Sequence, residues 1–193
     1  MAVKGAVAWL ARISTTKTNY WLGFVFDGIV CLALLIFGLS RAGIDPFSAV
    51  AVFVAGLLLF SFIEYFFHRW LFHRWVPVMI SGHRMHHENP LGYDALPFFV
   101  PSLVYMGVAM AFDLFMPLGY ASVLASAVAL GYIIYGLTHF FVHHFRFRNL
   151  LARKLVAYHQ IHHYHPQYNF GVTSPLWDII LGTRYQSQHK RLW

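Results

Sequence analysis

The chain has 193 residues, of which 59% are hydrophobic and only 11% are charged, and its formal net charge is +7. Soluble domains are about 45–50% apolar and about 25% charged, so the composition excludes an ordinary water-soluble globule. It predicts an integral membrane protein with a single domain, residues 1–193. One cysteine, Cys31, excludes a disulfide framework and a zinc–thiolate site. The chain has no run of five lysines or arginines, so we expect a bilayer and no nucleic acid as its partner.

Four apolar runs follow one another along the chain. Each is close to the length of about 20 residues that a helix needs to cross a hydrocarbon core about 30 Å thick. Helix is the expected form, because lipid cannot satisfy exposed backbone groups. The N-terminal segment has no cleavable signal pattern, so we expect the first run to remain as a span. The predicted spans cover approximately residues 20–40, 46–67, 97–116 and 119–140.

The positive charges orient these spans. All but one of the 14 lysines and arginines lie before the first run, after the second or after the fourth, and Arg41 is the exception. By the positive-inside rule, both termini and the segment between the second and third runs face the cytoplasm. The histidine clusters fall in these same cytoplasmic parts. We therefore predict an all-α fold in which four transmembrane helices carry a cytoplasmic helical cap with a histidine-rich dimetal site.

The histidines occur at repeated spacings. Residues 83–87 read "HRMHH" and residues 159–163 read "HQIHH". Positions i, i+3 and i+4 share one face of an α-helix, so the imidazoles of each box converge, as do those of the i, i+4 pair in "HFFVH" at 139–143. The pair in "HRWLFH" at 68–73 is five residues apart, about 140° around an α-helix. That pair requires a bulge, a helix end or two ions.

These sites together offer ten imidazoles. Ten ligands exceed the four of tetrahedral zinc and the six of an octahedral ion, so we expect two metal ions with about five nitrogens each. Imidazole binds iron, copper, nickel and zinc, so the ligand type alone does not choose the metal. The expected ligands are His68, His73, His83, His86, His87, His139, His143, His159, His162 and His163.

Two acids are candidates for orienting these ligands. Glu64 lies one helical turn before His68 and is expected to accept a hydrogen bond from that ring, with an ion pair to a nearby arginine as the alternative. Asp178 is expected to accept a hydrogen bond from a histidine of the cap, or else to cap a helix. No catalytic side chain is expected beyond the metal centre. Asn169 and Gly171 are expected as turn residues, with shaping of a substrate entrance as the alternative.

The motifs, taken in order, resemble a known family. The segments "EYFFHRWLFH", "GHRMHHENP", "THFFVHH" and "YHQIHHYHPQYNFGVTSPLWDIILGT" are similar to those of the fatty acid hydroxylase superfamily of membrane dimetal enzymes, and within it to the fatty acid 2-hydroxylases. The resemblance runs from about residue 64 to residue 183. It implies two iron ions on the ten histidines, with zinc as a substitute in a purified sample, and molecular oxygen as co-substrate. The implied reaction is 2-hydroxylation of a fatty acyl chain, free or in a sphingolipid-like lipid.

The resemblance also has a departure. Many eukaryotic members carry an N-terminal haem electron-carrier domain, and about nineteen residues before the first run leave no room for one. The resemblance therefore implies a separate electron-donor protein. It also implies a bacterial inner membrane as the location, or the endoplasmic reticulum if the chain is eukaryotic.

Other functions stay open on the sequence. The same scaffold suits a hydroxylase or desaturase of a sterol, a carotenoid or another lipid. A membrane metal-binding or transport protein would also carry many ligands, but transport ligands are expected near the middle of the membrane along a path, whereas these cluster at one predicted face. A scaffold without catalytic activity is disfavoured by ten intact ligands.

Overall fold

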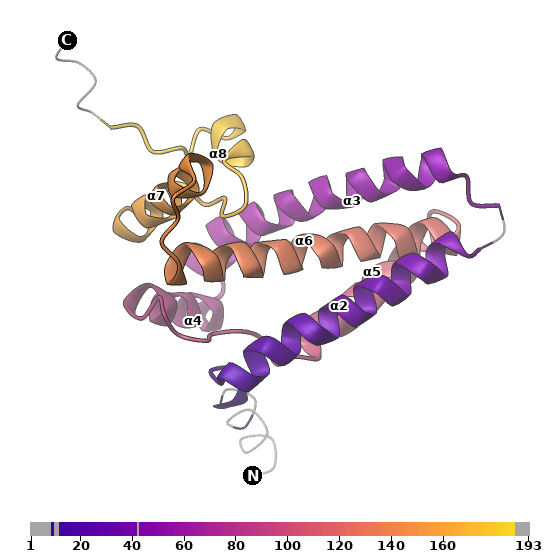
Figure 1. The fold of residues 1–193 in the computed structure, drawn as a ribbon, viewed down its shortest axis with the longest axis horizontal. Helices are drawn as coiled ribbons and strands as arrows, with labels where there is room; N and C mark the ends of the chain where they lie inside the picture. The colour runs from indigo at the N-terminus through magenta and orange to yellow at the C-terminus, as the bar shows by residue number, and fades with distance from the viewer. Residues whose placement is uncertain (1–8, 10–11, 42, 188–193) are drawn as a thin grey trace. The chain divides into compact units, whose positions relative to one another are not determined.

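A computed structural model describes residues 9, 12–41 and 43–187 of the chain (Figure 1). Within these ranges the chain forms helices, turns and loops and contains no strand, so the predicted all-α class is confirmed there. Expectations for the two termini, including Lys4, Lys190 and Arg191, lie outside the described residues. The elements are α2 (Lys17–Leu39), α3 (Pro46–Phe66), the π-helix η1 (Phe67–Trp75), α4 (Pro77–Glu88), α5 (Val100–Phe112), α6 (Leu118–His144), α7 (Leu150–Tyr164) and α8 (Leu176–Ile180).

Three of the predicted spans correspond to helices that are long and apolar enough to cross a membrane: Lys17–Leu39, Pro46–Trp75 and Leu118–His144. The third predicted span, 97–116, is shorter in the structure, where α5 has 13 residues. At 1.5 Å per residue α5 is about 20 Å long, less than a hydrocarbon core of about 30 Å. Pro101 in its first turn delays the helix, and the chain turns after residue 112. Four spans therefore stay a prediction.

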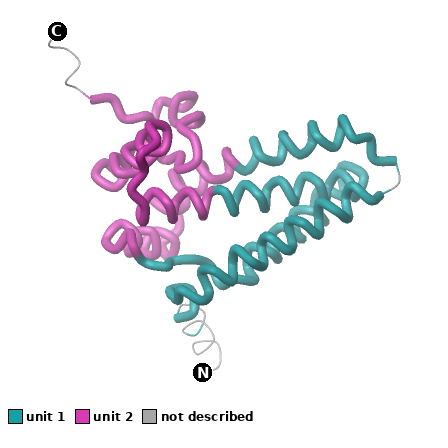
Figure 2. The backbone as a smooth tube through the Cα atoms, in the orientation of Figure 1, with its two compact units in different colours: residues 1–60, 92–134 teal, residues 61–91, 135–193 magenta. Residues whose placement is uncertain are grey.

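The chain divides into two compact units, which Figure 2 colours separately. Unit 1 comprises residues 1–60 and 92–134, and unit 2 comprises residues 61–91 and 135–193. Helices α3 and α6 each begin in unit 1 and end in unit 2, so their C-terminal turns belong to unit 2. All ten expected ligands lie in unit 2.

Unit 1 is held together by small residues and a few buried polar contacts. Asp27 of α2 is buried, and one oxygen of its carboxylate accepts a hydrogen bond of 3.0 Å from the Ser102 hydroxyl of α5. On α6, alanines recur among the buried residues, which lets neighbouring helices approach closely. At Gly56 of α3, an added Cβ would lie 2.7 Å from the Ala127 Cβ and 2.9 Å from the Leu124 carbonyl oxygen. The α3–α6 contact therefore requires glycine at this position.

We expect Gly56→Val to destabilise unit 1, because its side chain would overlap the α6 backbone. Overpacking of this kind costs about 1–3 kcal/mol. The matched control is Gly28→Val on α2, where an added Cβ meets nothing within 4 Å. Melting temperatures of the two variants in detergent measure the difference. Equal melting temperatures would contradict the close α3–α6 contact.

Candidate metal centre

The five-residue spacing of His68 and His73 is accommodated by a π-helix. Residues 67–75 form η1, whose backbone hydrogen bonds join residues i and i+5. One π-turn therefore brings the two imidazoles onto the same side, and their ring centroids lie 5.3 Å apart in a stacked arrangement. The sequence indicated that a regular α-helix would not serve this pair. The structure replaces the α-helix over nine residues.

Each H-x-x-H-H box divides its histidines between two groups of ligand atoms. In α4, His83 and His87 belong to one group and His86 to the other. In α7 the assignment is reversed, because His159 and His163 join the group of His86. The division follows from helix geometry: residues i and i+4 are about 40° apart around the helix, whereas i+3 and i+4 are about 100° apart. The three imidazoles of each box thus point toward the dimetal site, as expected, but they are divided between its two groups.

All ten expected ligands fall into these two groups. Within each group, one nitrogen from every histidine lies within 4.8 Å of the others. Each group has five members, as the expectation of about five nitrogens per ion requires. Group A consists of His68, His73, His83, His87 and His162. Group B consists of His86, His139, His143, His159 and His163.

The spacing of the nitrogens fits a bound ion. The closest Nε2–Nε2 distances lie between 2.9 Å, for His143 and His159, and 3.3 Å, for His86 and His163. Two imidazole nitrogens bound about 2.0–2.1 Å from one ion at a right angle are about 3 Å apart. Each group therefore has the dimensions of a set of ligands around a single ion.

The positions of the ring protons also fit a bound metal ion. The Nδ1 of His68 lies against the Phe170 carbonyl oxygen, and the Nδ1 of His162 lies 2.8 Å from the Tyr168 carbonyl oxygen. A carbonyl only accepts, so both Nδ1 atoms carry the proton and both Nε2 atoms bear a lone pair. The Nε2 of His68 is 3.0 Å from that of His83. A cation satisfies several converging lone pairs at once, so the residues present fit a metal ion.

Burial favours the neutral form of the imidazoles of α4 and α7. Burial is the largest cause that lowers their pKa, and neighbouring imidazoles lower it further for all of them except His87. The pKa of His86 falls to about 2 and that of His163 to about 3. The pKa of His162 also falls to about 3, although its bond to the Tyr168 carbonyl opposes the shift. Neutral imidazole is the form that binds metals, so burial prepares these ligands.

Neither of the two acids accepts a hydrogen bond from a histidine ligand, although both were expected to do so. The carboxylate of Glu64 accepts hydrogen bonds from the backbone N–H groups of Val172 and Thr173 and from the Thr173 hydroxyl, rather than from His68. Asp178 accepts from two backbone N–H groups of the same loop and from the hydroxyls of Tyr158 and Thr183, rather than from a histidine. Both acids therefore hold the loop that follows α7.

That loop depends on two residues with turn chemistry. Asn169 has a φ of 57°, the left-handed conformation that asparagine tolerates better than most residues. Its buried side chain donates to the Tyr158 carbonyl and accepts from the Tyr185 N–H. At Gly171 an added Cβ would lie 2.1 Å from the Ser174 carbonyl oxygen. The sequence marked both as turn residues, and the structure agrees.

Histidines outside the repeated spacing lie outside both groups. The His144 ring stacks on Phe140 with centroids 4.0 Å apart, and the His165 ring stacks on Tyr185. His189 lies outside the described residues. Although His144 directly follows a member of group B, its Nδ1 meets the Phe140 carbonyl oxygen at 3.0 Å. It therefore serves as a matched control for its neighbour, His143.

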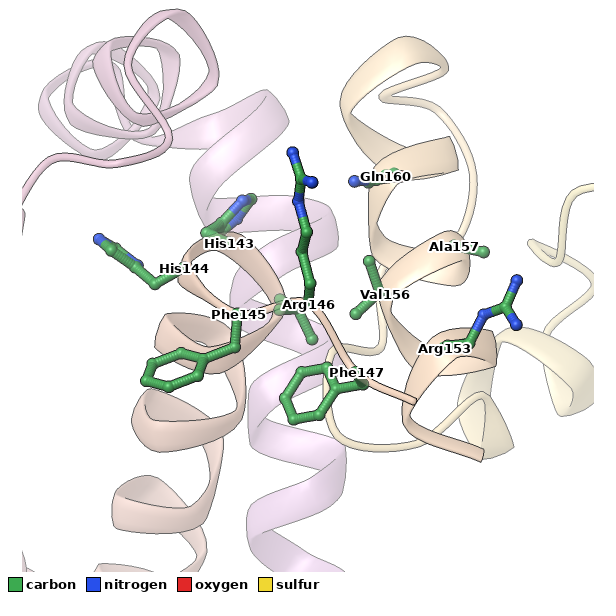
Figure 3. A pocket seen from close by; sticks show the side chains of 10 residues that line it. His143, His144, Phe145, Arg146, Phe147, Arg153, Val156, Ala157 and Gln160 are labelled. Carbon is green, nitrogen blue, oxygen red and sulfur yellow. The ribbon is translucent and has the colours of Figure 1, made fainter. Parts of the chain in front are cut away.

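Two pockets of unit 2 border the groups. A pocket of about 410 Å³ is lined by His143 of group B together with Arg146, Arg153 and Gln160. In Figure 3 the Arg146 side chain extends from the α6–α7 connection toward Gln160 of α7. A second pocket of about 230 Å³ is lined by His73 of group A. Each group is thus adjacent to a hollow in the surface of unit 2.

Comparison with known proteins agrees with this geometry. The model of the family described as Fatty acid hydroxylase matches residues 53–183, a range that contains all ten histidines, Glu64 and Asp178. The chain belongs to the fatty acid hydroxylase family. A solved structure of full-length scs7p, in which only the hydroxylase domain is visible, matches with a TM-score of 0.77 and 28% identity. The match covers 92% of the present chain and 70% of the scs7p chain.

Curated relatives carry names that describe acyl hydroxylation. The dihydroceramide fatty acyl 2-hydroxylase FAH1 of Arabidopsis thaliana is 28% identical over 170 residues, which are 80% of the present chain and 70% of the plant protein. The fatty acid 2-hydroxylase of Rattus norvegicus is 31% identical over 190 residues, 92% of this chain. The match covers 50% of the rat protein, so the chain spans about half the length of that relative.

We expect the purified chain to hold two metal ions, one on each group of five nitrogens. Replacing a ligand should lower the metal content, so His143→Ala should lose about one ion per chain. The control His144→Ala should keep both, because its ring belongs to neither group. Metal analysis by mass spectrometry gives the stoichiometry directly. One ion per unsubstituted chain, or equal loss in the two variants, would contradict the two-group arrangement.

Proposed function

We propose that this chain is an oxygen-dependent membrane lipid hydroxylase with a non-haem diiron centre. Its reaction is 2-hydroxylation of a fatty acyl chain, free or in a sphingolipid-like lipid. The observation that carries the proposal is the pair of adjacent groups, each with five nitrogens. Five ligands leave a position open on an ion that prefers six, and a closed structural site would not do so. The names of the relatives support the acyl chain as substrate and carbon 2 as the target.

The reaction requires redox chemistry that side chains do not supply. One atom of molecular oxygen enters a C–H bond as hydroxyl and the other leaves as water, which consumes two electrons and two protons. Bound iron supplies the redox chemistry by which oxygen attacks an unactivated C–H bond. The chain's own residues bind the ions, fix the rings and exclude water. Burial of His68, His159 and His162, which are at most 1% exposed, accords with that last task.

The ligand set consists of nitrogen, and the two neighbouring carboxylates belong to neither group. Glu64 and Asp178 are buried in unit 2, and hydrogen bonds from one loop occupy both. The site thus keeps ten neutral ligands and leaves the positive charge of the ions to be balanced by what binds at the open positions.

We further propose that the histidine site and both termini face the cytoplasm, in a bacterial inner membrane or, in a eukaryote, the endoplasmic reticulum. The support is the distribution of lysine and arginine along the chain. The same proposal makes α5 the fourth span. An element about 20 Å long crosses a bilayer only where the membrane thins or flanking residues extend the span.

The proposed reaction predicts labelled lipid in a host that expresses the chain under ¹⁸O-labelled oxygen gas. One labelled oxygen should appear on an acyl chain, and fragmentation should place it on carbon 2. The His163→Ala variant should lose at least 90% of the product, because it removes a group B ligand, and His144→Ala should keep it. Lipid mass spectrometry of the three cultures is the measurement.

The outcomes separate the alternatives. Label on a sterol, a carotenoid or another acyl carbon would retain the oxygenase and replace the substrate. A new double bond without label would indicate desaturation. A metal-loaded chain that consumes no oxygen when supplied with a reductant would overturn the oxygenase and favour metal binding or transport.

We infer that electrons come from a separate protein with an acidic surface, which docks at the arginine-lined pocket. Among the described residues of unit 2 the acids Glu64 and Asp178 are buried, and Glu88 is the exposed one. Arg146 and Arg153 are exposed beside the pocket. His143 lines the same pocket and belongs to group B, so one imidazole would separate a docked redox group from an ion bound by group B. Such charge complementarity accelerates association.

We expect the double variant Arg146→Glu/Arg153→Glu to receive electrons from an acidic ferredoxin at least ten times more slowly at low salt. Reduction by photoreduced deazaflavin, an uncharged reductant, should be unchanged. The control Arg84→Glu/Arg184→Glu makes the same charge change at two exposed positions outside the pocket lining. Stopped-flow absorbance in nanodiscs measures both rates. An unchanged ferredoxin rate, with lost dependence on anionic lipid, would assign the pocket to a lipid headgroup and contradict the docking proposal.

A further inference from the structure

The two groups of histidines differ in how their outer ring nitrogens are held. In group A, the Nδ1 of His68 meets the Phe170 carbonyl oxygen and the Nδ1 of His162 meets the Tyr168 carbonyl oxygen. Both rings are fully or almost fully buried. The two carbonyls come from one short stretch of the loop after α7. One loop therefore orients two ligands of group A.

This loop is braced from two sides. Asp178, in the first turn of α8, accepts hydrogen bonds from the N–H groups of Phe170 and Gly171, at 2.9 Å and 2.7 Å. Glu64 at the end of α3 accepts from the N–H group of Thr173 at 3.0 Å and from the Thr173 hydroxyl. Both carboxylates are buried, where charge-assisted hydrogen bonds are strongest. The carbonyls of residues 168 and 170 thus have little freedom to move.

Group B contains a ring without this support. His159 is 1% exposed, and its Nε2 lies 2.9 Å from that of His143 and 3.1 Å from that of His163. A ring that binds an ion through Nε2 carries its proton on Nδ1. The Nδ1 of His159 is buried and has no hydrogen-bond partner. An unsatisfied buried donor costs about 1–3 kcal/mol, and a ligand without an outer partner is a weaker base.

We infer that the two metal positions are unequal: group A forms the tight position, group B forms the exchangeable one, and Glu64 and Asp178 are positioning residues for group A. They act through the backbone carbonyls of the loop and do not touch the ion. The inference rests on the dimetal centre of the proposed function, but it concerns affinity and does not depend on which lipid is hydroxylated. Loss of an outer hydrogen bond to a ligand typically lowers metal affinity about 10–100-fold.

Titration of the metal-free chain with Co²⁺ in competition with a coloured chelator tests the order of binding. We expect two steps whose dissociation constants differ by at least tenfold. His87→Ala, which removes a group A ligand, should abolish the tight step. His163→Ala, which removes a group B ligand, should abolish the weak step. Two equal steps, or the reverse assignment, would overturn the inference.

The positioning role is tested by Glu64→Gln, which keeps the shape of the side chain and removes its charge. We expect the tight step to weaken about 10–100-fold while the weak step changes less than threefold. Thr173→Val is the milder second variant, since it removes one hydrogen bond to Glu64 and keeps the backbone contacts. It should weaken the tight step in the same direction, and it remains informative if Glu64→Gln fails to fold.

The matched control is Trp177→Phe. It lies next to Asp178 but donates its indole N–H to the Ser61 hydroxyl at 3.0 Å, away from the loop carbonyls. Its two binding steps should equal those of the unsubstituted chain. Equal weakening of both steps in Glu64→Gln would mean a general structural role and overturn the assignment. A chain that binds in the expected order but hydroxylates no lipid would leave this inference standing and remove the proposed function.

Discussion

Unit 2 depends on one constraint: ten imidazoles, buried or half-buried, converge in two groups whose ring nitrogens lie close together. Protonated rings at such distances would repel, and neutral rings direct lone pairs at their neighbours. Burial removes the water that would otherwise satisfy them. Two cations resolve both problems, since each accepts several lone pairs at once. The π-helix, the paired boxes and the braced loop all hold these rings close together.

Much of this site was predictable, because histidine spacing is a local property. The i, i+4 pairs, the two boxes and the number of ligands follow from residue numbers, and five nitrogens per ion follow from their total. Helix geometry sets residue i+3 apart from i and i+4, but spacing could not show that His86 joins the outer pair of the other box and that His162 does the same. That assignment depends on the position of the facing helices. Similarly, the five-residue separation of His68 and His73 left a bulge, a helix end or two ions open and did not specify the π-helix that the structure contains.

The less predictable features depend on partners distant in sequence. Glu64 lies one turn before His68, so a direct bond was the simplest expectation, yet its hydrogen-bond partners are more than 100 residues later, at Val172 and Thr173. The carbonyl groups that orient the ligands belong to the backbone, so no type of side chain marks them in the sequence. The length of α5 was missed for another reason: hydropathy averages across residues 97–116 and does not register that proline and a turn shorten the helix.

The reciprocal division of the boxes has a mechanical consequence. Helices η1 and α6 each contribute ligands to one group, whereas α4 and α7 each contribute to both. Adjacent residues, His86 and His87 on α4 and His162 and His163 on α7, belong to different groups. Adjacent Cα atoms are 3.8 Å apart and rigidly placed in a helix, so the separation of the two positions is built into α4 and α7. A relative movement of η1 or α6 can loosen one position, but the distance between the two changes only if α4 and α7 unwind or move apart. The motif that occurs twice is therefore the one that links the two groups, because each copy contributes adjacent histidines to both.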